Sequence, residues 1–451
     1  MSYTPNTETE RNEMLKKIGV ASFDELISKL PQEIKFKGKL NLPEKISEYE
    51  ALKLLKKYAD MNKTAANNIC FMGGGAYDHF IPSIVGFVLD RAEFKTAYTP
   101  YQAEVSQGTL QAMYEYQSMV CNLTGMDVSN ASLYDGASAL AEACLMANSI
   151  NNKKEFLIAG TINPHYLKVM QTICSGKQFI FKSYIDKDGT CDLDALASAI
   201  NENTSAVIVQ QPNAYGNLEE VWEIEKITHS KKALYIVSVD PLSLGILSAP
   251  AEYNADIVTA EGQSLGIPLS YGGPYLGIFA TKKDFLRKMP GRIAGITQDI
   301  DGNRGFVLTL QTREQQIKRE KATSNICTNQ GLYMLAATVY MATLGKQGIK
   351  EVAELCFQNA HYLASQIQRI NGYELISNKP FFKEFLVIPP ISPSVILEEA
   401  EKEGILGGID TGRYPDCKRG LLIAVTEKRT KDEIEKYLEI LRRFEKQSSL
   451  F

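Results

Sequence analysis

Apolar runs and amphipathic stretches alternate along the chain from about residue 130 to residue 281. The run SAVIVQQP at 205–212 is apolar through its centre, which is typical of a strand buried on both faces of a sheet. The stretch LEEVWEIEKITHSKK at 218–232 carries its apolar residues at helical spacing. The pattern predicts strands at 155–162, 178–184, 205–212, 233–240, 255–260 and 275–281, and helices at 137–147, from about Pro164, at 193–200 and at 218–232.

This alternation is typical of an α/β fold with a mostly parallel sheet that helices cover on both faces. In sheets of this kind, binding sites lie outside the carboxyl ends of the strands. We therefore expect a site formed by the segments that follow Ile162, Val209, Val239 and Ala260.

Helical segments flank this central region. Capping boxes of the form S/T-x-x-E at Thr7, Ser22 and Ser47 predict short helices near the N-terminus, an arm that usually packs on a neighbouring chain. A long helical stretch follows Thr328 and leads into a small unit of strands and helices. We expect three parts: a helical N-terminal arm at 1–70, a large α/β domain at 71–330, and a long helix with a small α+β domain at 331–451.

Composition and charge narrow the possible function classes. The 451 residues include 49 basic and 53 acidic side chains, so no excess of positive charge remains for a nucleic-acid backbone. No apolar run reaches the ~18 residues that a membrane span requires, and the polar N-terminus has no secretory signal. The eight cysteines include no CxxC pair, and the four histidines lack zinc-ligand spacing. We expect a cytoplasmic protein that binds neither nucleic acid, nor membrane, nor metal.

Polar residues crowd into a loop that precedes the segment GTLQAMYEYQSM. A solvated loop does not require two tyrosines, a proline and a glutamate within so few positions. The loop either lines a binding site or contacts another subunit. Its polar residues are Tyr98, Thr99, Tyr101, Gln102, Glu104, Ser106 and Gln107.

Two segments could bind an anion through backbone amides. FMGGGAYDHF at 71–80 contains three consecutive glycines, although a structural turn is the simpler explanation. Gly136, Ala137 and Ser138 stand at a helix start, where free amides and the helix dipole favour phosphate. An ordinary helix start is again the simpler explanation.

Three further segments carry candidate chemistry. Asp240 ends a buried strand, where its carboxylate could face a cationic ring nitrogen or could simply begin the turn at Pro241. The glycine-rich loop at 259–274 could carry a reactive side chain. The segment TSNICTN at 323–329 is compact and polar, and it follows a charged stretch that reads as a solvated helix.

Four long motifs give the chain a resemblance to a known family. AYTPYQAEVSQG, NASLYDGASALAEA, GQSLGIPLSYGGPYLG and REQQIKREKATSNICTNQ closely resemble the first subunit of two-subunit P-proteins, the glycine dehydrogenases (decarboxylating) of the glycine cleavage system. The resemblance implies the pyridoxal-phosphate (PLP) transferase fold type I, with a seven-stranded type of sheet and an N-terminal arm that embraces a partner. It also implies decarboxylation of glycine and transfer of the aminomethyl group to the lipoyl arm of H-protein.

The resemblance also implies roles for individual positions. Asp240 matches the acid that pairs with the ring nitrogen of PLP. Gln263 stands where the partner subunit carries the lysine that binds PLP covalently, and no lysine lies between Asp240 and Lys282. Gly160 takes the place of the histidine that stacks on the cofactor ring. An amide nitrogen cannot form an imine, because its lone pair is delocalised into the carbonyl.

The resemblance therefore implies that PLP is held by the second (β) subunit and that this chain is inactive alone. Its contribution would be to complete the active site across the interface. The alternatives are a purely architectural or regulatory subunit, or an independent PLP enzyme that uses a distant lysine. The residues expected to complete the site are Tyr98, Tyr101, Gln102, Glu104, Ser106, Gln107, Thr323, Ser324, Asn325 and Thr328. A remnant of the cofactor pocket is expected at Gly136, Ala137, Ser138, Asp240 and Gln263.

Overall fold

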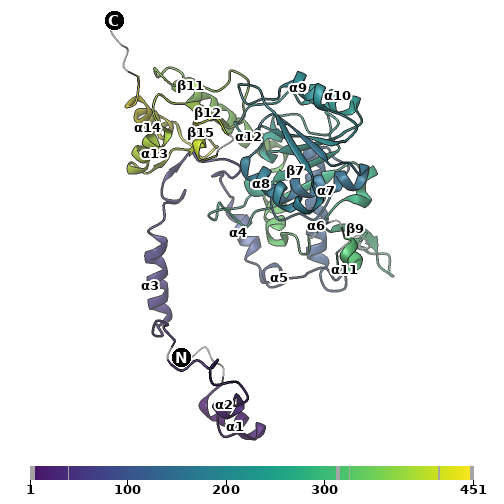
Figure 1. The fold of residues 1–451 in the computed structure, drawn as a ribbon, viewed down its shortest axis with the longest axis vertical. Coiled ribbons are helices and arrows are strands. Elements are labelled where there is room, and N and C mark those ends of the chain that lie inside the picture. The colour runs from purple at the N-terminus through teal and green to yellow at the C-terminus, as the bar shows by residue number, and fades with distance from the viewer. Residues whose placement is uncertain are drawn as a thin grey trace. The chain divides into compact units, whose positions relative to one another are not determined.

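The chain divides into two compact units, Met1–Lys63 and Thr64–Phe451, which are described separately (Figure 1). No helix among the described residues combines the length and the apolar character needed to cross a membrane. The structure is a computed structural model that describes residues 6–38, 40–310, 315–322, 324, 326–414 and 417–446.

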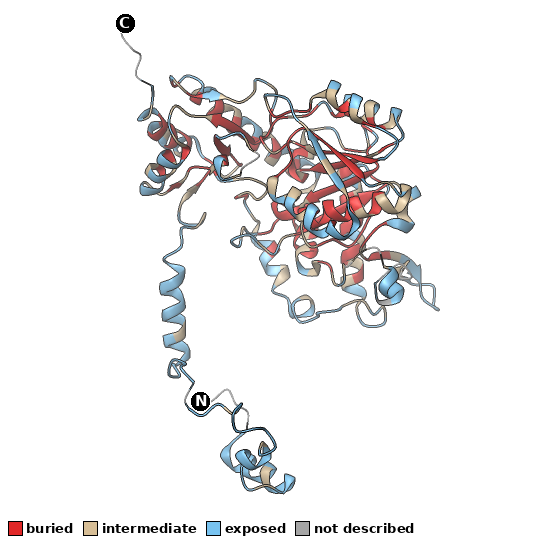
Figure 2. Cartoon of the chain, viewed as in Figure 1, coloured by how far each residue is buried: buried red, intermediate tan, exposed pale blue. Residues whose placement is uncertain are grey.

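The N-terminal unit contains three helices that begin at the predicted capping residues. They are α1 (Glu8–Ile18), α2 (Phe23–Leu26) and α3 (Glu48–Ala59). Complete capping boxes form at Thr7 and Ser47, as predicted. The third box is half formed, because Ser22 accepts from the Glu25 amide while the Glu25 carboxylate accepts from the Ala21 amide. None of the residues in these helices is buried (Figure 2). The unit therefore exposes its apolar side chains.

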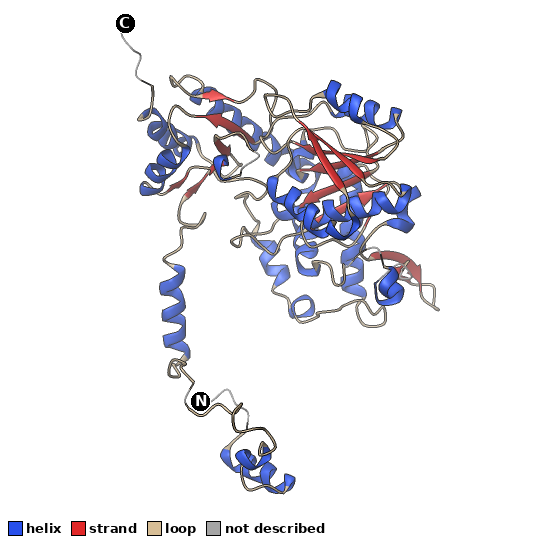
Figure 3. Ribbon diagram, viewed as in Figure 1, coloured by secondary structure: helices blue, strands red, loops and turns tan. Residues whose placement is uncertain are grey.

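A seven-stranded sheet of order β2-β8-β7-β6-β5-β3-β4 forms the centre of the second unit (Figure 3). Neighbouring strands from β4 to β7 are parallel, and β8 runs antiparallel to both β7 and β2. The mostly parallel sheet predicted from the sequence is therefore confirmed. The strands are β2 (Val128–Ser129), β3 (Glu155–Ala159), β4 (Ile180–Tyr184), β5 (Thr204–Gln211), β6 (Leu234–Val239), β7 (Ile257–Glu261) and β8 (Gly277–Thr281).

Alternate side chains of each central strand enter different hydrophobic clusters. Phe156 and Ile158 of β3 pack with the residues of α7, whereas Leu157 and Ala159 pack with those of α6, α10 and α12. Both faces of the sheet are thus covered, which explains why the strands are apolar at nearly every position. The helices are α6 (Gln107–Thr124), α7 (Gly136–Asn151), α8 (Pro164–Ile173), α9 (Leu193–Ala199), α10 (Val221–Ser230) and α12 (Gly331–Ile367).

The long helix α12 bends at Gly345 and leads to a second, antiparallel sheet of order β11-β12-β15-β14. Helices α13 and α14 pack beside this sheet, and a hydrophobic cluster of their side chains fills the space between them. The elements are β11 (Glu374–Leu375), β12 (Glu384–Ile388), α13 (Pro393–Lys402), β14 (Ile409–Asp410), β15 (Leu421–Ala424) and α14 (Lys431–Arg442). The smaller elements are β1 (Ile69–Cys70), which pairs with β13 (Ile405–Leu406), the hairpin of β9 (Ile293–Gln298) and β10 (Arg304–Thr309), and the short helices α4 (Ser83–Leu89), α5 (Ala92–Lys95) and α11 (Gln315–Lys318).

The turn after β5 meets β12 at Gly216, where the two sheets come into backbone contact. Gly216 has a φ of +87°, and an added Cβ would overlap the carbonyl oxygen of Glu384. Only glycine therefore allows this close approach.

Gly216→Ala should destabilise the chain more than Gly302→Ala, which has a similar φ of +81° but open space around it. The Gly302 variant pays only the left-handed backbone penalty of ~1–2 kcal/mol. The Gly216 variant should lose about 1–3 kcal/mol more, because the Glu384 backbone must move. Urea denaturation of both variants measures the difference, and equal losses would contradict the argument.

Candidate functional site

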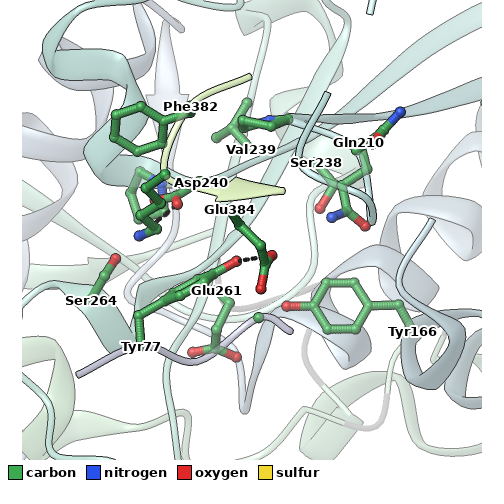
Figure 4. A pocket seen from close by; sticks show the side chains of 16 residues that line it. Tyr77, Tyr166, Gln210, Ser238, Val239, Asp240, Glu261, Ser264, Phe382 and Glu384 are labelled. Atoms are coloured by element: carbon green, nitrogen blue, oxygen red, sulfur yellow. Dashed lines mark hydrogen bonds and ion pairs between the residues drawn. The ribbon is translucent and has the colours of Figure 1, made fainter. Parts of the chain in front are cut away.

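A pocket of about 40 Å³ lies at the carboxyl ends of the parallel strands (Figure 4). Gln210, Asp240 and Glu261 line it from the ends of β5, β6 and β7, and Glu384 lines it from β12. A water molecule needs about 10–15 Å³ of such volume, so the pocket has room for only a few waters. It lies where the strand pattern placed the expected site.

Asp240 forms a largely buried ion pair in this pocket. Its Oδ1 accepts from the amide of Leu242, and its Oδ2 lies 2.7 Å from the ammonium nitrogen of Lys383. Lys383 is only 1% exposed and precedes β12 in the second sheet. The ion pair therefore connects the end of β6 with the start of β12.

The Lys383 ammonium has a favourable contact in each of three directions. Besides Asp240, it lies 2.9 Å from Nε2 of His79 and 3.8 Å from the centre of the Tyr77 ring. These contacts match the three hydrogens of an ammonium group, one of them through a cation–π interaction. A lysine held in this way is a fixed cation and not a free amine.

His79 extends the chain of charges to Glu427. Because Nε2 of His79 accepts from Lys383, its proton lies on Nδ1, which is 2.7 Å from the Glu427 carboxylate. Burial and the nearby Lys383 ammonium lower the pKa of His79, so the ring is neutral. Burial alone would raise the pKa of Glu427, but the hydrogen bonds from His79 and from the Phe80 amide lower it.

The same histidine belongs to a cluster whose side chains are of types that bind metals. Ligand atoms of His79, Cys356 and Glu427 lie within 4.8 Å of one another. Both ring nitrogens of His79 are engaged, and the Lys383 ammonium beside the ring would repel a metal ion. The cluster is therefore best described as a hydrogen-bonded group.

Gln263 is buried, and its amide bonds both to the glycine-rich loop at 71–80 and to Ile267. Its Oε1 accepts from the Tyr77 amide at 2.8 Å, and its Nε2 donates to the carbonyls of Tyr77 at 3.0 Å and Ile267 at 2.8 Å. The loop is thus fixed by hydrogen bonds within the chain, in agreement with the structural explanation of its glycines.

The start of α7, predicted to suit a phosphate, is occupied by acidic side chains. The amide of Gly136 donates to Glu261 at 2.9 Å, and the amide of Ser138 donates to Asp135 at 2.7 Å. Glu261 also accepts from the amides of Gln263 and Leu276. Burial raises the pKa of Glu261 to about 8, and these amides oppose the increase. Ala137 is buried between the two capped positions.

The loop at 98–108 contacts the described residues of the polar segment at 323–329 through Tyr101. Its hydroxyl lies 2.6 Å from the carbonyl oxygen of Thr328 and 2.9 Å from Oδ1 of Asn329, and the Arg292 guanidinium lies over its ring. Ser324 accepts from the Ile326 amide within the turn. The candidates Thr323 and Asn325 lie outside the described residues.

The other candidates in this loop divide into exposed and structural residues. Tyr98 is 82% exposed, and Gln102 and Glu104 are also exposed. Gln107 instead holds β10, because its amide both accepts from the Phe306 amide and donates to the Phe306 carbonyl at 2.8 Å. Ser106 stands at the start of α6 without a side-chain cap. Among the described residues, those that line the Asp240 pocket include none from this loop.

Lys383 and Glu384, which the sequence did not single out, complete the pocket together with Tyr77 of the 71–80 segment. Glu384 accepts from the Gly74 amide at 2.6 Å and from the Tyr77 hydroxyl at 3.0 Å, and burial raises its pKa to about 7. No local pattern distinguishes these residues from an ordinary turn and strand.

Gly160 has no room for a side chain, since an added Cβ would overlap the Glu219 carboxylate.

These residues do not fit PLP. The oxygen of Asp240 that could pair with a ring cation is already bonded to Lys383, the amides at the α7 start are bonded to carboxyl groups, and Gln263 offers no amine. What the arrangement does instead is hold the two sheets and the 71–80 loop together through buried ionic and hydrogen bonds.

Removing one charge of the Asp240–Lys383 pair should be far more harmful than removing both. Lys383→Met leaves a buried carboxylate unpaired, so we expect the free energy of unfolding to fall by about 3–5 kcal/mol. The double variant Asp240→Asn/Lys383→Met should recover much of that loss. As a control, Lys379→Met removes a half-exposed lysine 3.6 Å from Asp188 and should cost at most ~1 kcal/mol. Chemical denaturation measures the free energy of unfolding of each variant. If the double variant is no more stable than Lys383→Met, the two charges are not energetically coupled.

Several solved structures share this fold. A crystal structure of glycine decarboxylase (P-protein) of the glycine cleavage system, in inhibitor-bound form, matches with a TM-score of 0.90 and 39% identity over 98% of this chain and 100% of that chain. Sphingosine-1-phosphate lyase from Burkholderia pseudomallei matches with a TM-score of 0.67 over 92% of this chain and 94% of that chain, but at 14% identity it shows the fold alone. The predicted fold type I is thus confirmed.

Relatives in sequence cover nearly the whole chain. The probable glycine dehydrogenase (decarboxylating) subunit 1 of Chloroherpeton thalassium is 52% identical over 98% of this chain and 99% of its own length. The protein of the same name from Carboxydothermus hydrogenoformans is 51% identical with the same coverage. The model of the glycine cleavage system P-protein family matches residues 1–441. The chain therefore belongs to the glycine cleavage system P-protein family.

Proposed function

We propose that this chain is the subunit of a two-subunit glycine decarboxylase that does not anchor PLP. With its partner subunit, it decarboxylates glycine and transfers the aminomethyl group to the lipoyl arm of H-protein. The observation that supports the proposal is that Gln263 is a buried amide bonded within the chain at both its oxygen and its nitrogen. The family resemblance implies that this position corresponds to the covalent lysine of the partner. When bound to the partner, PLP supplies the electron sink for the loss of CO2.

The loop at 98–108 is our candidate for this chain's contribution to the shared active site. Tyr101 is anchored by the carbonyl of Thr328 and by the Arg292 guanidinium, whereas Tyr98 is largely exposed. An anchored loop that presents exposed polar side chains suits binding across an interface, because its conformation is fixed before the partner arrives. Its groups would bind the glycine carboxylate or the cofactor phosphate, or would line the channel for the lipoyl arm.

The N-terminal unit supports association with a partner. Its helices bury none of their residues, and apolar side chains such as Leu52, Leu55 and Tyr58 of α3 are each more than half exposed. Apolar residues exposed in this number are typical of a surface that another chain covers. We propose that the partner is the second subunit of the P-protein.

Glycine-dependent exchange of CO2 should appear only when both subunits are present. We expect this chain alone and the partner alone to show background exchange, and a mixture to show full activity, because each half lacks groups that the other supplies. The assay uses purified subunits with added PLP and lipoylated H-protein. Substantial exchange by this chain alone, or a covalent PLP adduct on it, would overturn the proposal.

Tyr98→Ala should lower the kcat/KM of the assembled enzyme by about tenfold or more, because loss of a positioning contact misplaces the reactants. The control is Val105→Ala, which is 77% exposed in the same loop but has no polar side-chain atom, and which should stay near wild type. Size-exclusion chromatography checks that both variants still assemble. If Tyr98→Ala assembles into an intact complex with unchanged activity, Tyr98 does not contribute to the active site and the loop has only an architectural role.

A further inference from the structure

The Lys383 ammonium and the Glu261 carboxyl group stand at the points where PLP would be recognised. We propose that Lys383 and Glu261 are built-in replacements for the ring cation and the phosphate of PLP. The pocket is then closed to the cofactor by these two groups as well as by the missing lysine. This inference rests on the proposal that the partner subunit holds PLP, and it concerns how that exclusion is achieved.

Lys383 supplies the positive charge that Asp240 would otherwise receive from a ring nitrogen. Oδ1 of Asp240 accepts from the Leu242 amide, and the Lys383 ammonium lies 2.7 Å from the other oxygen, Oδ2. A pyridinium N–H would need that same oxygen. If a ring cation displaced the Lys383 ammonium from Asp240, that ammonium would remain buried between His79 and the Tyr77 ring without its counter-ion.

Glu261 supplies the acceptor that the amides at the start of α7 would otherwise find in a phosphate. Its two oxygens accept from three backbone amides, those of Gly136, Gln263 and Leu276. Anions bind at helix starts through amides of this kind. The contact is also tight, because a Cβ added at Gly136 would lie 2.9 Å from Cβ of Glu261. A phosphate therefore cannot reach this amide while Glu261 stays in place.

Glu384 adds a further obstacle from the second sheet. It lies in the same pocket, held by the Gly74 amide and the Tyr77 hydroxyl, and leaves about 40 Å³ of free space beside Asp240 and Glu261. Since Lys383 and Glu384 are adjacent in the chain, one segment brings both the cation and an acid into the pocket. The side chains of β12 and of the residue before it therefore fill part of the pocket.

The test is to reinstate the missing lysine with and without the two replacements. The variants are Gln263→Lys, Gln263→Lys/Lys383→Met, and the triple variant that adds Glu261→Ser. Each full-length chain is incubated with PLP and reduced with borohydride, and peptide mass mapping measures the adduct at position 263. We expect little adduct on Gln263→Lys, clear loading of the double variant, and half-saturation of the triple variant at a PLP concentration at least about tenfold lower than for Gln263→Lys.

Two controls separate the roles of charge and phosphate. Gln263→Lys/Lys379→Met removes a lysine of the same segment that bonds to Thr190 outside the pocket, and it should load no better than Gln263→Lys. Pyridoxal, which lacks the phosphate, should give the same adduct yield as PLP on the double variant. On the triple variant, pyridoxal should give a lower adduct yield than PLP. If Lys383→Met does not yield folded chain by circular dichroism, Lys383→Gln takes its place.

Full loading of Gln263→Lys alone would overturn this inference and leave the proposed function intact, since the natural chain lacks that lysine. Failure of the folded triple variant to load would overturn it as well. A covalent adduct on the unaltered chain would instead refute the proposed function. The outcomes for the two proposals are therefore distinguishable.

Discussion

The second unit of this protein depends on one buried ion pair, between Asp240 at the end of β6 and Lys383 at the start of β12. A carboxylate at this depth costs several kcal/mol unless an opposite charge accompanies it. Lys383 meets that requirement, and its other contacts, with His79 and Tyr77, draw the 71–80 loop into the same cluster. One interaction thus joins the two sheets and the loop between them.

The hydrogen bonds around the pair follow from it. With Lys383 as the donor, His79 must carry its proton on Nδ1, which then reaches Glu427 before α14. Gln263 fixes the loop from the opposite side through both atoms of its amide. Asp240, Lys383, His79 and Gln263 each have partners of matching kind, which is the condition under which a buried polar network specifies one arrangement.

Much of the fold could be predicted from the sequence, because it depends on short-range patterns. The apolar run that forms β5 and the capping residue Asp135 of α7 act through near neighbours. The pocket could be placed at the strand ends for the same reason, and Asp240 lies there. Lys383 could not be predicted: Lys379 stands four positions earlier in the same segment and is half exposed, and nothing local distinguishes the two.

The candidate residues show the same limit. The helix start at Gly136 was recognisable, but its acceptor, Glu261, lies 125 positions away and is brought there only by the pairing of β7 with its neighbours. Gln107 stood within the polar loop and turned out to hold β10. Tyr101 could be named as a candidate, yet its contact with Thr328 needed the tertiary fold.

The pocket and the outer surface of this chain therefore differ in whether their side chains have partners within the chain. Inside, Asp240, Glu261 and Gln263 are each bonded to other groups of the chain, so these three side chains are not available to a cofactor. Outside, an anchored loop leaves Tyr98 exposed, and the N-terminal helices leave their apolar residues uncovered. If loosely held water filled the pocket in place of Lys383, the Asp240 carboxylate would have no fixed counter-ion and its surroundings would be flexible. Closing it with Lys383 yields a rigid body, and rigidity is what a surface needs if it is to form one wall of a site whose reacting atoms lie on another chain.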